Sequence, residues 1–406
     1  MVKIVRRRSR QASYLVVALL LAGYGYWALS RPLPLLQPEK AITDLQVQSA
    51  SSKLAWPGVG QSAVGIVGTG ILETHGTQTP APTASTAKII TVLNVLRIKP
   101  LQPGQQGPTI TLTANDAAIY NAYVAEGGSV VPVQAGEQIS EYQMLQAILL
   151  PSANNMADSL AIWAFGSLPA YAAAATSYLH QLGLSETHIG ADASGFSPTT
   201  TSTAHDLVRL GELAMQNPVL AGIVAQPSAS GIPLTTGVKN VNYLLGTNNI
   251  IGVKTGNTDQ AGGVYVSASR AVVNGKLVTL VTALVGAPTL FESMKASVPL
   301  IRSAQANFAT TSVITAGAVV GRYHTPWSGS VGAIASKDLN VTTWNDSTVS
   351  ASINLQPVSA KARADKTVGT VSSSGSSPFT SQQPISVKLQ NAPIAPSILW
   401  RLTHPF

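Results

Sequence analysis

Residues 82–96 have the sequence PTASTAKIITVLNVL, and the fold class that we expect rests first on this stretch. Ser85 and Lys88 lie three positions apart, so on a helix their side chains share one face. A serine hydroxyl is a weak nucleophile until a base takes its proton, and a lysine is such a base when burial lowers its pKa. The apolar run from Ile89 to Leu93 predicts a buried helix. Taken alone, this spacing is more typical of an ordinary helix.

A second short motif follows in LLPSANNMADSLA (residues 149–161), where a proline marks a break between two predicted helices. A loop between helices can direct the Ser152 hydroxyl and the Asn154 amide into a cleft. Ser152 alone is more typical of a helix N-cap. The same Ser-x-Asn pattern recurs at Ser352 and Asn354, inside a predicted β run, and we expect that copy at the surface.

The third motif is Lys254-Thr255-Gly256 in GVKTGNT (residues 252–258), directly after a strand-like run. A strand with Lys and Thr at the edge of a cleft can bind a carboxylate through charge and a hydroxyl. Gly256 would leave room for a substrate backbone to approach the strand. Taken alone, this triplet is commonly a turn.

The order of the three motifs is more specific than any one of them. Ser-x-x-Lys, Ser-x-Asn and Lys-Thr-Gly on a helix, a loop and a strand are the motif set of penicillin-binding proteins and serine β-lactamases. The surrounding phrases, such as THIGADASGFSPTTTSTAHDLVRLGELAMQNP (residues 187–218) and ARADKTVGTV (residues 362–371), resemble the DacA-like D-alanyl-D-alanine carboxypeptidases of peptidase family S11. The resemblance implies an α+β fold, with an antiparallel sheet packed with helices and a small all-β domain after it.

The resemblance also implies a catalytic role for each motif residue. Ser85 would attack the carbonyl of the penultimate D-alanine and carry the acyl group, and Lys88 would accept the serine proton. Ser152 would relay a proton to the leaving amine, and Asn154 would orient Lys88 and the substrate amide. A β-lactam would acylate the same Ser85.

On the binding side, Lys254 and Thr255 would hold the terminal carboxylate, with Gly256 beside them. The backbone N–H groups of Ser85 and Asn257 would form an oxyanion hole. Asn257 stands where many members of the family have His, so any tuning by that His is not expected here. No cofactor and no metal ion is implied, and the histidines show no metal-binding spacing.

Composition and charge exclude other classes of protein. Of the 406 residues, 45% are hydrophobic and 10% charged, which excludes a disordered chain and a coiled coil. The absence of cysteine excludes disulfides and a thiol nucleophile. The net charge of +8 does not indicate nucleic-acid binding, because much of it is a terminal cluster: Lys3, Arg6, Arg7, Arg8 and Arg10.

An uncharged stretch, Gln11–Ser30, follows that basic cluster and has an apolar core from Tyr14 to Leu29. Positive residues stay on the cytoplasmic side, so we expect the cell membrane as the location and the rest of the chain on the cell-wall side. Aromatic residues near Trp27 favour an uncleaved anchor. A signal peptide cleaved near Ala28-Leu29-Ser30 is the alternative.

Four segments are expected along the chain: 1–30 as basic stretch and anchor or signal, 31–55 as a linker, 56–307 as the D-Ala-D-Ala carboxypeptidase domain, and 308–406 as a β domain. Within them we predict a strand over 64–72, helices over 85–98, 140–150, 168–182 and 289–307, and a hairpin at Asn274-Gly275. The last residues, 396–406, resemble the start of the family's amphipathic membrane helix. They are too few to anchor firmly, so the N-terminal segment is expected to do so.

The implied partners are peptidoglycan stem peptides that end in D-Ala-D-Ala, β-lactams as inhibitors, and the membrane. Two alternatives keep the fold. A class A β-lactamase needs a Glu-x-x-x-Asn pattern before Lys254, and neither Glu186 nor Glu212 fits it. A non-catalytic wall-binding scaffold is the other alternative, although every motif residue is present.

Overall fold

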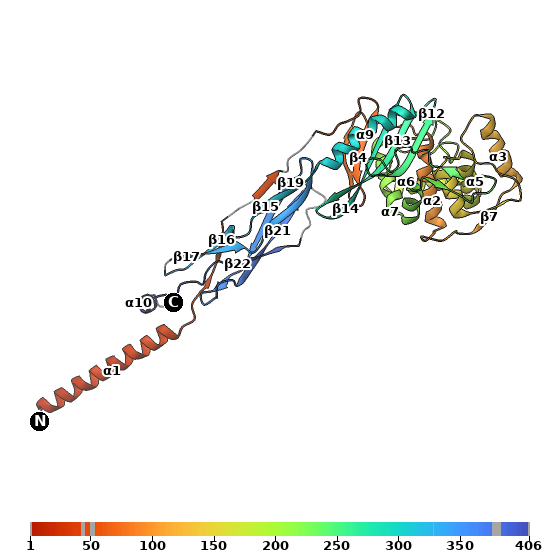
Figure 1. Cartoon of the computed structure of the whole chain (residues 1–406). Coiled ribbons are helices and arrows are strands. Elements are labelled where there is room, and N and C mark those ends of the chain that lie inside the picture. Colours follow the sequence, from red (N-terminus) through yellow and green to blue (C-terminus); the bar gives the residue numbers. More distant parts are fainter. Residues whose placement is uncertain (1, 42–44, 49–52, 328, 376–382, 405–406) are drawn as a thin grey trace. The chain divides into compact units, whose positions relative to one another are not determined.

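The computed structural model describes the whole chain except residues 1, 42–44, 49–52, 328, 376–382 and 405–406. It contains two compact units (Figure 1). The central unit is Ser52–Phe308, and the terminal unit is Met1–Ser51 together with Ala309–Phe406. The central unit is thus one continuous segment, whereas the terminal unit joins both ends of the sequence.

A five-stranded antiparallel sheet is the framework of the central unit, in the order β12-β13-β14-β4-β5. Asn274 and Gly275, with φ of 50° and 74°, form the turn between β13 and β14, which confirms the predicted hairpin. β12, which carries Lys254, lies at one edge of the sheet. The strands are β4 (Gln61–Ile66), β5 (Gly70–His75), β12 (Ile250–Thr258), β13 (Gly262–Val273) and β14 (Lys276–Ala287), with short ladders of β6 (Ala81–Pro82) with β9 (Thr201–Ser202), β7 (Thr109–Thr111) with β8 (Gln138–Ser140), and β10 (Ser228–Ala229) with β11 (Val238–Lys239).

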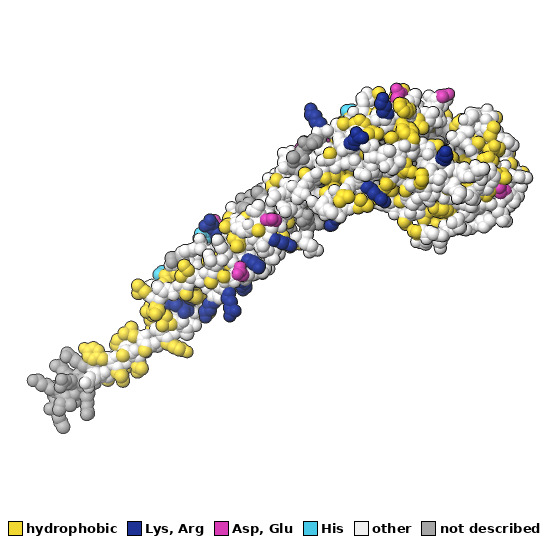
Figure 2. Space-filling view, viewed as in Figure 1, with side chains coloured by type: hydrophobic (Ala, Val, Ile, Leu, Met, Phe, Trp, Pro, Cys, Tyr) yellow, Lys and Arg dark blue, Asp and Glu magenta, His cyan; other side chains and the backbone are white. Residues whose placement is uncertain are grey.

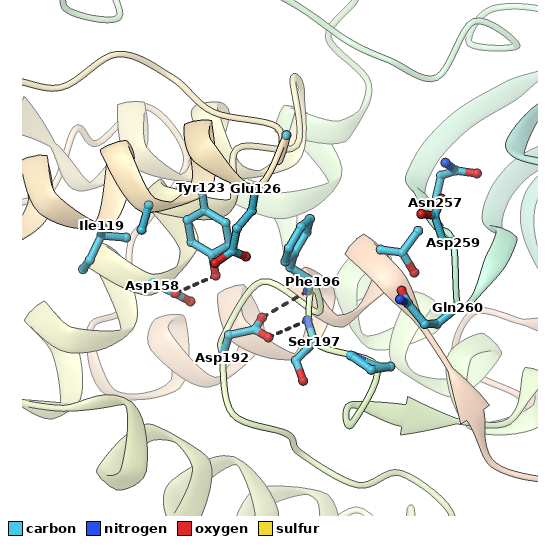
Figure 3. Close-up of a pocket in the computed structure, with 14 residues that line it drawn as sticks. Ile119, Tyr123, Glu126, Asp158, Asp192, Phe196, Ser197, Asn257, Asp259 and Gln260 are labelled. Atoms are coloured by element: carbon cyan, nitrogen blue, oxygen red, sulfur yellow. Dashed lines mark hydrogen bonds between the residues drawn. The ribbon is translucent and has the colours of Figure 1, made fainter.

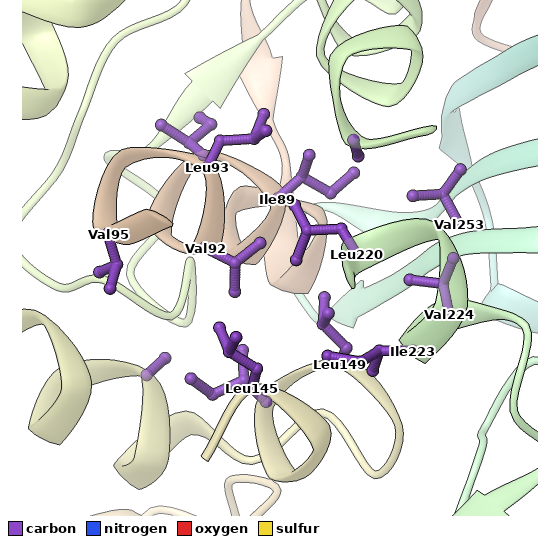
Figure 4. Packing of buried hydrophobic residues seen from close by; sticks show 14 of the residues in the cluster. Ile89, Val92, Leu93, Val95, Leu145, Leu149, Leu220, Ile223, Val224 and Val253 are labelled. Atoms are coloured by element: carbon purple, nitrogen blue, oxygen red, sulfur yellow. The ribbon is translucent and has the colours of Figure 1, made fainter. Parts of the chain in front are cut away.

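Helix α2 lies at the centre of this unit, and every residue from Lys88 to Leu96 is buried. A helix that is apolar all round needs cover on all sides, and Figure 4 shows α2 sharing one core with residues of α4, α8 and β12. Figure 1 shows the sheet between α9 and a group that includes α2, α6 and α7. The helices are α2 (Lys88–Ile98), α3 (Ala114–Ala125), α4 (Glu141–Leu149), α5 (Asn154–Phe165), α6 (Leu168–Gln181), α7 (Ala204–Gln216), α8 (Pro218–Val224) and α9 (Leu290–Ala306).

Local sequence signals explain where several of these helices begin and end. Ser140 caps α4 in a reciprocal capping box with Gln143. Gly183, with a φ of 73°, follows α6 at the C′ position, as predicted. The prediction of a single strand over 64–72 is wrong in one respect, because the chain turns back within this segment and forms two strands, β4 and β5. Gly68 and Gly70, with φ of 84° and 103°, allow that reversal.

The terminal unit contains a seven-stranded antiparallel sheet in the order β2-β16-β17-β22-β21-β19-β3. Its core includes Tyr323, Val341 and Val371, all without exposed area. The strands are β1 (Leu35–Leu36), β2 (Pro38–Lys40), β3 (Leu45–Gln48), β15 (Phe308–Ile314), β16 (Val319–His324), β17 (Ser330–Ala335), β18 (Leu339–Trp344), β19 (Thr348–Leu355), β20 (Val358–Ser359), β21 (Thr367–Gly375) and β22 (Ile385–Leu389). β15 pairs with β18, and β1 pairs with β20.

The expectation of a linker over 31–55 is therefore wrong for Leu35–Leu36, Pro38–Lys40 and Leu45–Gln48, which form strands. β2 and β3 form the two edges of the seven-stranded sheet, and β1 pairs with β20. Proline is tolerated in an edge strand because its missing N–H would face away from the ladder. The Pro-rich, polar composition that indicates a spacer is thus equally compatible with edge strands such as Pro38–Lys40.

Helix α1 (Val2–Ser30) opens the terminal unit. Within the residues that the structure describes, its segment Gln11–Ser30 is the one helix long and apolar enough to cross a membrane. At 1.5 Å per residue, such a helix extends about 30 Å, close to the thickness of the hydrocarbon core of a bilayer. A short helix near the C-terminus, α10 (Ile398–Thr403), contacts α1.

Candidate active site

Ser85 lies in the 3-10 turn η1 (Ala84–Ala87), directly before α2, and not in the first α-helical turn that the sequence predicts. Ala84 adopts a φ of +45°, a conformation that non-glycine residues rarely adopt. This sharp entry places Ser85 Oγ 2.7 Å from Lys88 Nζ. Ser85 is half-buried whereas Lys88 is completely buried, so the hydroxyl can be reached while the amine is shielded from water.

The Lys88 ammonium has an acceptor for each of its three protons. Its Nζ donates to Ser85 Oγ, to Asn154 Oδ1 at 2.7 Å and to the carbonyl oxygen of Ser194 at 2.9 Å. Burial lowers the pKa of Lys88 to about 7, although the negative charges of Asp192 and Asp158 oppose that shift. Near neutral pH a large fraction of Lys88 is therefore uncharged and able to accept a proton.

Ser152 lies in the break between α4 and α5, where it adopts a φ of 70°. Lys254 Nζ, on β12, donates to Ser152 Oγ at 2.8 Å and to the Thr255 carbonyl oxygen at 3.1 Å. Burial lowers the pKa of Lys254 well below its ordinary value, and the positive charge of Lys88 lowers it further. The second and third sequence motifs thus meet through one buried hydrogen bond.

Two buried lysines, Lys88 and Lys254, share one site, and neither forms an ion pair with a described residue. In the described part of the chain, neither Lys88 nor Lys254 has a carboxylate oxygen within 4.0 Å. Buried cations are costly unless an anion compensates them. The site therefore favours a ligand that brings its own negative charge.

The rest of the Lys-Thr-Gly strand lies against the Ser85 turn. A Cβ added at Gly256 would lie 2.8 Å from the Thr83 carbonyl oxygen and 3.2 Å from the Ser85 nitrogen. Glycine is thus required so that β12 can approach that turn. This close approach is a second reason for a glycine at this position, besides the expected space for substrate. Thr255 is buried beside it, and the exposed Asn257 accepts the Leu290 N–H through Oδ1 at 3.3 Å.

A loop that the sequence motifs did not indicate completes the surroundings of Lys88. The carboxylate of Asp192 organises this loop by accepting several hydrogen bonds between 2.6 and 3.2 Å, from the backbone N–H groups of Ser194, Gly195, Phe196 and Ser197 and from the Ser194 hydroxyl. The loop conformation directs the Ser194 carbonyl oxygen at Lys88 Nζ.

A second carboxylate, Asp158, supports the same loop from α5. Its Oδ2 accepts the Tyr123 hydroxyl at 2.7 Å, and its Oδ1 accepts the Ala193 N–H at 2.8 Å. Burial raises the pKa of Asp158 to about 6. Asp158 and Asp192 therefore place negative charge near Lys88 without direct contact, which limits how far burial lowers the pKa of Lys88.

A pocket of about 690 Å³ opens beside this cluster. Figure 3 shows α3 residues such as Tyr123 on one side, the Asp192 loop below, and on the other side Asn257 at the end of β12 with Asp259 and Gln260 of the turn that follows. Asp158, Asp192 and Asn257 are among the residues that line the pocket, whereas Ser85, Lys88 and Lys254 are not. The size of the pocket suits a peptide of a few residues.

The family of the chain follows from comparison with known proteins. A profile of the D-alanyl-D-alanine carboxypeptidase family, peptidase S11, matches residues 65–288. The chain belongs to this family. The protein is 30% identical over 184 residues to the D-alanyl-D-alanine carboxypeptidase DacA of Escherichia coli K12, covering 43% of each chain. It is 34% identical over 172 residues to DacB2 of Mycobacterium tuberculosis, covering 40% of this chain and 58% of that one. It spans about half the length of the curated relatives it matches.

Solved structures place this S11 chain in the fold of penicillin-binding proteins. Penicillin-binding protein 5 of Haemophilus influenzae has a TM-score of 0.57 at 19% identity, over 85% of this chain and 99% of that one. The PBP3 of Streptococcus pneumoniae has a TM-score of 0.58 at 18% identity, over 84% and 100% of the two chains. These likenesses confirm the predicted fold class, a transpeptidase-like α+β unit.

All of the motif residues that the S11 resemblance implied lie in the cluster or on its rim. The structure joins Ser85, Lys88 and Asn154 in one set of hydrogen bonds and Ser152 with Lys254 in another. Ser194, Asp192 and Asp158 were not predicted as site residues from the sequence. The signal for two of them was the turn-rich phrase ADASGFSP (residues 191–198), which does not by itself reveal a contact with Lys88.

Proposed function

We propose that this protein is a serine D-Ala-D-Ala carboxypeptidase, which removes the terminal D-alanine from peptidoglycan stem peptides and is acylated by β-lactams. The observation that carries the proposal is the 2.7 Å contact between Ser85 Oγ and a buried Lys88 whose pKa lies at about 7. Such an amine, once uncharged, accepts the serine proton at neutral pH and makes the hydroxyl nucleophilic.

In the first half of the reaction, Ser85 Oγ bonds to the carbonyl carbon of the penultimate D-alanine while its proton passes to Lys88 Nζ. The amide C–N bond then breaks, and the leaving amine takes up a proton. Ser152 is assigned to deliver that proton because its Oγ, which accepts a hydrogen bond from Lys254, still has its own proton to donate. Ser152 then regains a proton from Lys88, the one that Lys88 accepted from Ser85, so that Lys88 is uncharged again before the second half of the reaction.

The free carboxylate of the substrate is assigned to Lys254 and Thr255. This assignment gives the two buried lysines the negative charge that the described part of the protein does not place next to them. A peptide that ends in a carboxylate therefore suits the site better than the interior of a chain.

The oxyanion that develops on the attacked carbonyl is assigned to the backbone N–H groups of Ser85 and Asn257. β12 is an edge strand, so the groups along its outer side are not occupied by another strand of the sheet. In the second half of the reaction, water gives its proton to Lys88, its oxygen bonds to the acyl carbon, and Ser85 regains its hydroxyl proton.

The cell-wall side of the membrane is the proposed place of this reaction. The support is the basic cluster before Gln11–Ser30, since positive residues stay cytoplasmic. The substrate class, peptides of the cell wall, lies on the same side.

Intact mass spectrometry with benzylpenicillin tests the proposal. We expect a stable adduct on the wild-type protein, release of D-alanine from a peptide ending in D-Ala-D-Ala, and neither with Ser85→Ala. Ser352→Ala is the matched control for Ser152→Ala, because it alters the second Ser-x-Asn copy, which is exposed on β19. It should keep full activity, whereas Ser152→Ala should lose most of it.

Two outcomes would contradict the proposal. Rapid turnover of penicillin without a lasting adduct would indicate a β-lactamase. Absence of both adduct and D-alanine release from a folded protein would indicate a binding scaffold.

A further inference from the structure

A cluster of side-chain contacts outside the candidate active site joins α1 and α10. Tyr24 Oη, on α1, donates to the carbonyl oxygen of Leu402 at 2.6 Å. In the opposite direction, the Arg401 guanidinium donates to the carbonyl oxygen of Arg31, directly after α1. Both hydrogen bonds join residues near the two ends of the sequence, so the last turn of α1 is part of the folded terminal unit.

Aromatic rings reinforce the junction on both helices. The Arg31 guanidinium lies 4.4 Å from the ring centroid of Trp27, a cation–π contact. Trp400 of α10 lies between two rings, with centroid distances of 5.1 Å to Trp327 and 4.8 Å to His404. We call these residues, together with Tyr24 and Arg401, the aromatic clamp.

The clamp buries Ala28, one residue of the stretch where a signal peptide would be cleaved. Ala28, in the Ala28-Leu29-Ser30 stretch, is only 4% exposed, although its neighbours along α1 are largely exposed. It lies in the last turn of a continuous helix, beside Trp400 and His404. Cleavage at this position would remove Tyr24 and Trp27 from the protein. The contacts of these side chains with Leu402 and Arg31 would then be lost.

The outer surface of the clamp has the chemistry of a lipid headgroup layer. Ile394, Ile398 and Leu399 are 72%, 66% and 70% exposed. Ile398 and Leu399 lie on α10, which contacts α1. Figure 2 shows hydrophobic side chains along the described part of α1. Aromatic rings and arginines at the end of such a helix are typical of the membrane interface, where rings enter the headgroup layer and cations meet phosphates.

We infer that the aromatic clamp rests on the lipid headgroups and makes α1 a permanent anchor, retained in the mature protein as part of the terminal unit. The short α10 does not anchor the protein alone. It docks beside α1 and adds its apolar residues to the same membrane surface.

Retention of α1 is tested on the full chain recovered from the membrane fraction of the producing cells. Intact mass and the N-terminal peptide are measured. We expect a chain that still contains Tyr24 to Ser30. A mature chain that begins at or after Leu29 would overturn the inference.

Docking of α10 is tested by cysteine labelling, which has no background because the chain has no cysteine. Leu399→Cys is compared with Val272→Cys, at a position 73% exposed on β13 of the central unit. The full-length variants are placed in phosphatidylglycerol–phosphatidylethanolamine vesicles or in detergent without lipid, and treated with a membrane-impermeant maleimide.

In vesicles, the labelling of Val272→Cys gives the fraction of molecules that the reagent can reach, and the labelling of Leu399→Cys is corrected for that fraction. We then expect Leu399→Cys to label about tenfold more slowly than Val272→Cys, as for side chains that enter the headgroup layer. Both positions should label similarly once a short-chain detergent replaces the bilayer. Equal labelling of the two positions in vesicles would overturn the lipid contact, even if α1 is retained.

Discussion

Lys254 Nζ donates a hydrogen bond to Ser152 Oγ across 2.8 Å, although the two residues are 102 positions apart. The strand that is assigned to the substrate carboxylate is therefore connected directly to the hydroxyl that is assigned to protonate the leaving group. When a carboxylate draws the Lys254 ammonium toward itself, the same movement changes the hydrogen bonding of Ser152. With these two proposed roles, substrate binding and leaving-group protonation would be coupled through one pair of side chains.

The acylation rate should depend on the protonation of Lys88. Because its pKa lies at about 7, the uncharged form that accepts the Ser85 proton increases as the pH rises. We expect the rate of benzylpenicillin acylation to rise between about pH 5.5 and 8.5 and then level off. Lys88→Arg, which stays protonated, should acylate about 10²-fold or more slowly at every pH. A flat profile for the wild type would contradict the role of Lys88 as the base.

Replacing Asp192 by asparagine should move that profile. The negative charge of Asp192 raises the pKa of Lys88 against the effect of burial, so Asp192→Asn should lower the pKa of Lys88. The midpoint of the acylation profile should then shift to lower pH. Asp365→Asn, in the terminal unit, is the control. An unchanged or raised midpoint in a correctly folded Asp192→Asn protein would refute this electrostatic role.

Gly256→Ala tests the close approach of β12 to the Ser85 turn. The added Cβ would lie 2.8 Å from the Thr83 carbonyl oxygen, so the strand or the turn has to move. Displacement of a reacting group by about 1 Å can lower the rate about 10²-fold, and we expect a loss of that order in acylation. Gly222→Ala, where nothing lies within 4 Å, should leave it unchanged. Full activity of Gly256→Ala would show that the contact is dispensable.

Glu141 should make the protein less stable as the pH rises. Its side chain is buried at the start of α4, and neither carboxylate oxygen has a hydrogen-bond partner within the described residues. Burial raises its pKa to about 7, from 4.5 in an unfolded chain. The folded state therefore binds the proton more tightly, and stability is lost between those two pH values. Glu141→Gln should raise the Tm at pH 8 but change it little at pH 5, as measured by calorimetry. Equal shifts at both pH values would contradict this account.

The central unit should work without the terminal unit on soluble substrates. The fragment Ser52–Phe308 contains every residue of the candidate site and the core cluster around α2. We expect it to be acylated by penicillin at nearly the wild-type rate. A chain cut after residue 307 should instead aggregate, because β1, β2 and β3 lose their partners. A folded but unreactive Ser52–Phe308 fragment would show that the terminal unit takes part in the chemistry.

The motifs allowed the sequence to predict the core of the site because each lies on a local element that the surrounding residues specify. Ser85 follows from its place before an apolar helix, and Lys254 from its place on a strand. The carbonyl oxygen of Ser194 was not predictable, because its approach to Lys88 depends on how the Asp192 carboxylate folds a loop. The strands near residues 35–48 were missed because their partners lie some 300 residues further along the chain.

That pairing has a consequence for the order of events during biosynthesis. Both edges of the seven-stranded sheet come from residues near the start of the sequence, and all of its inner strands come from the last hundred or so. The central unit, a continuous segment, can fold as soon as it emerges, because it needs nothing that is translated later. The edge strands, by contrast, stay unpaired until the final strands have been synthesised. Truncation late in the message would leave a folded central unit joined to edge strands that have no partners.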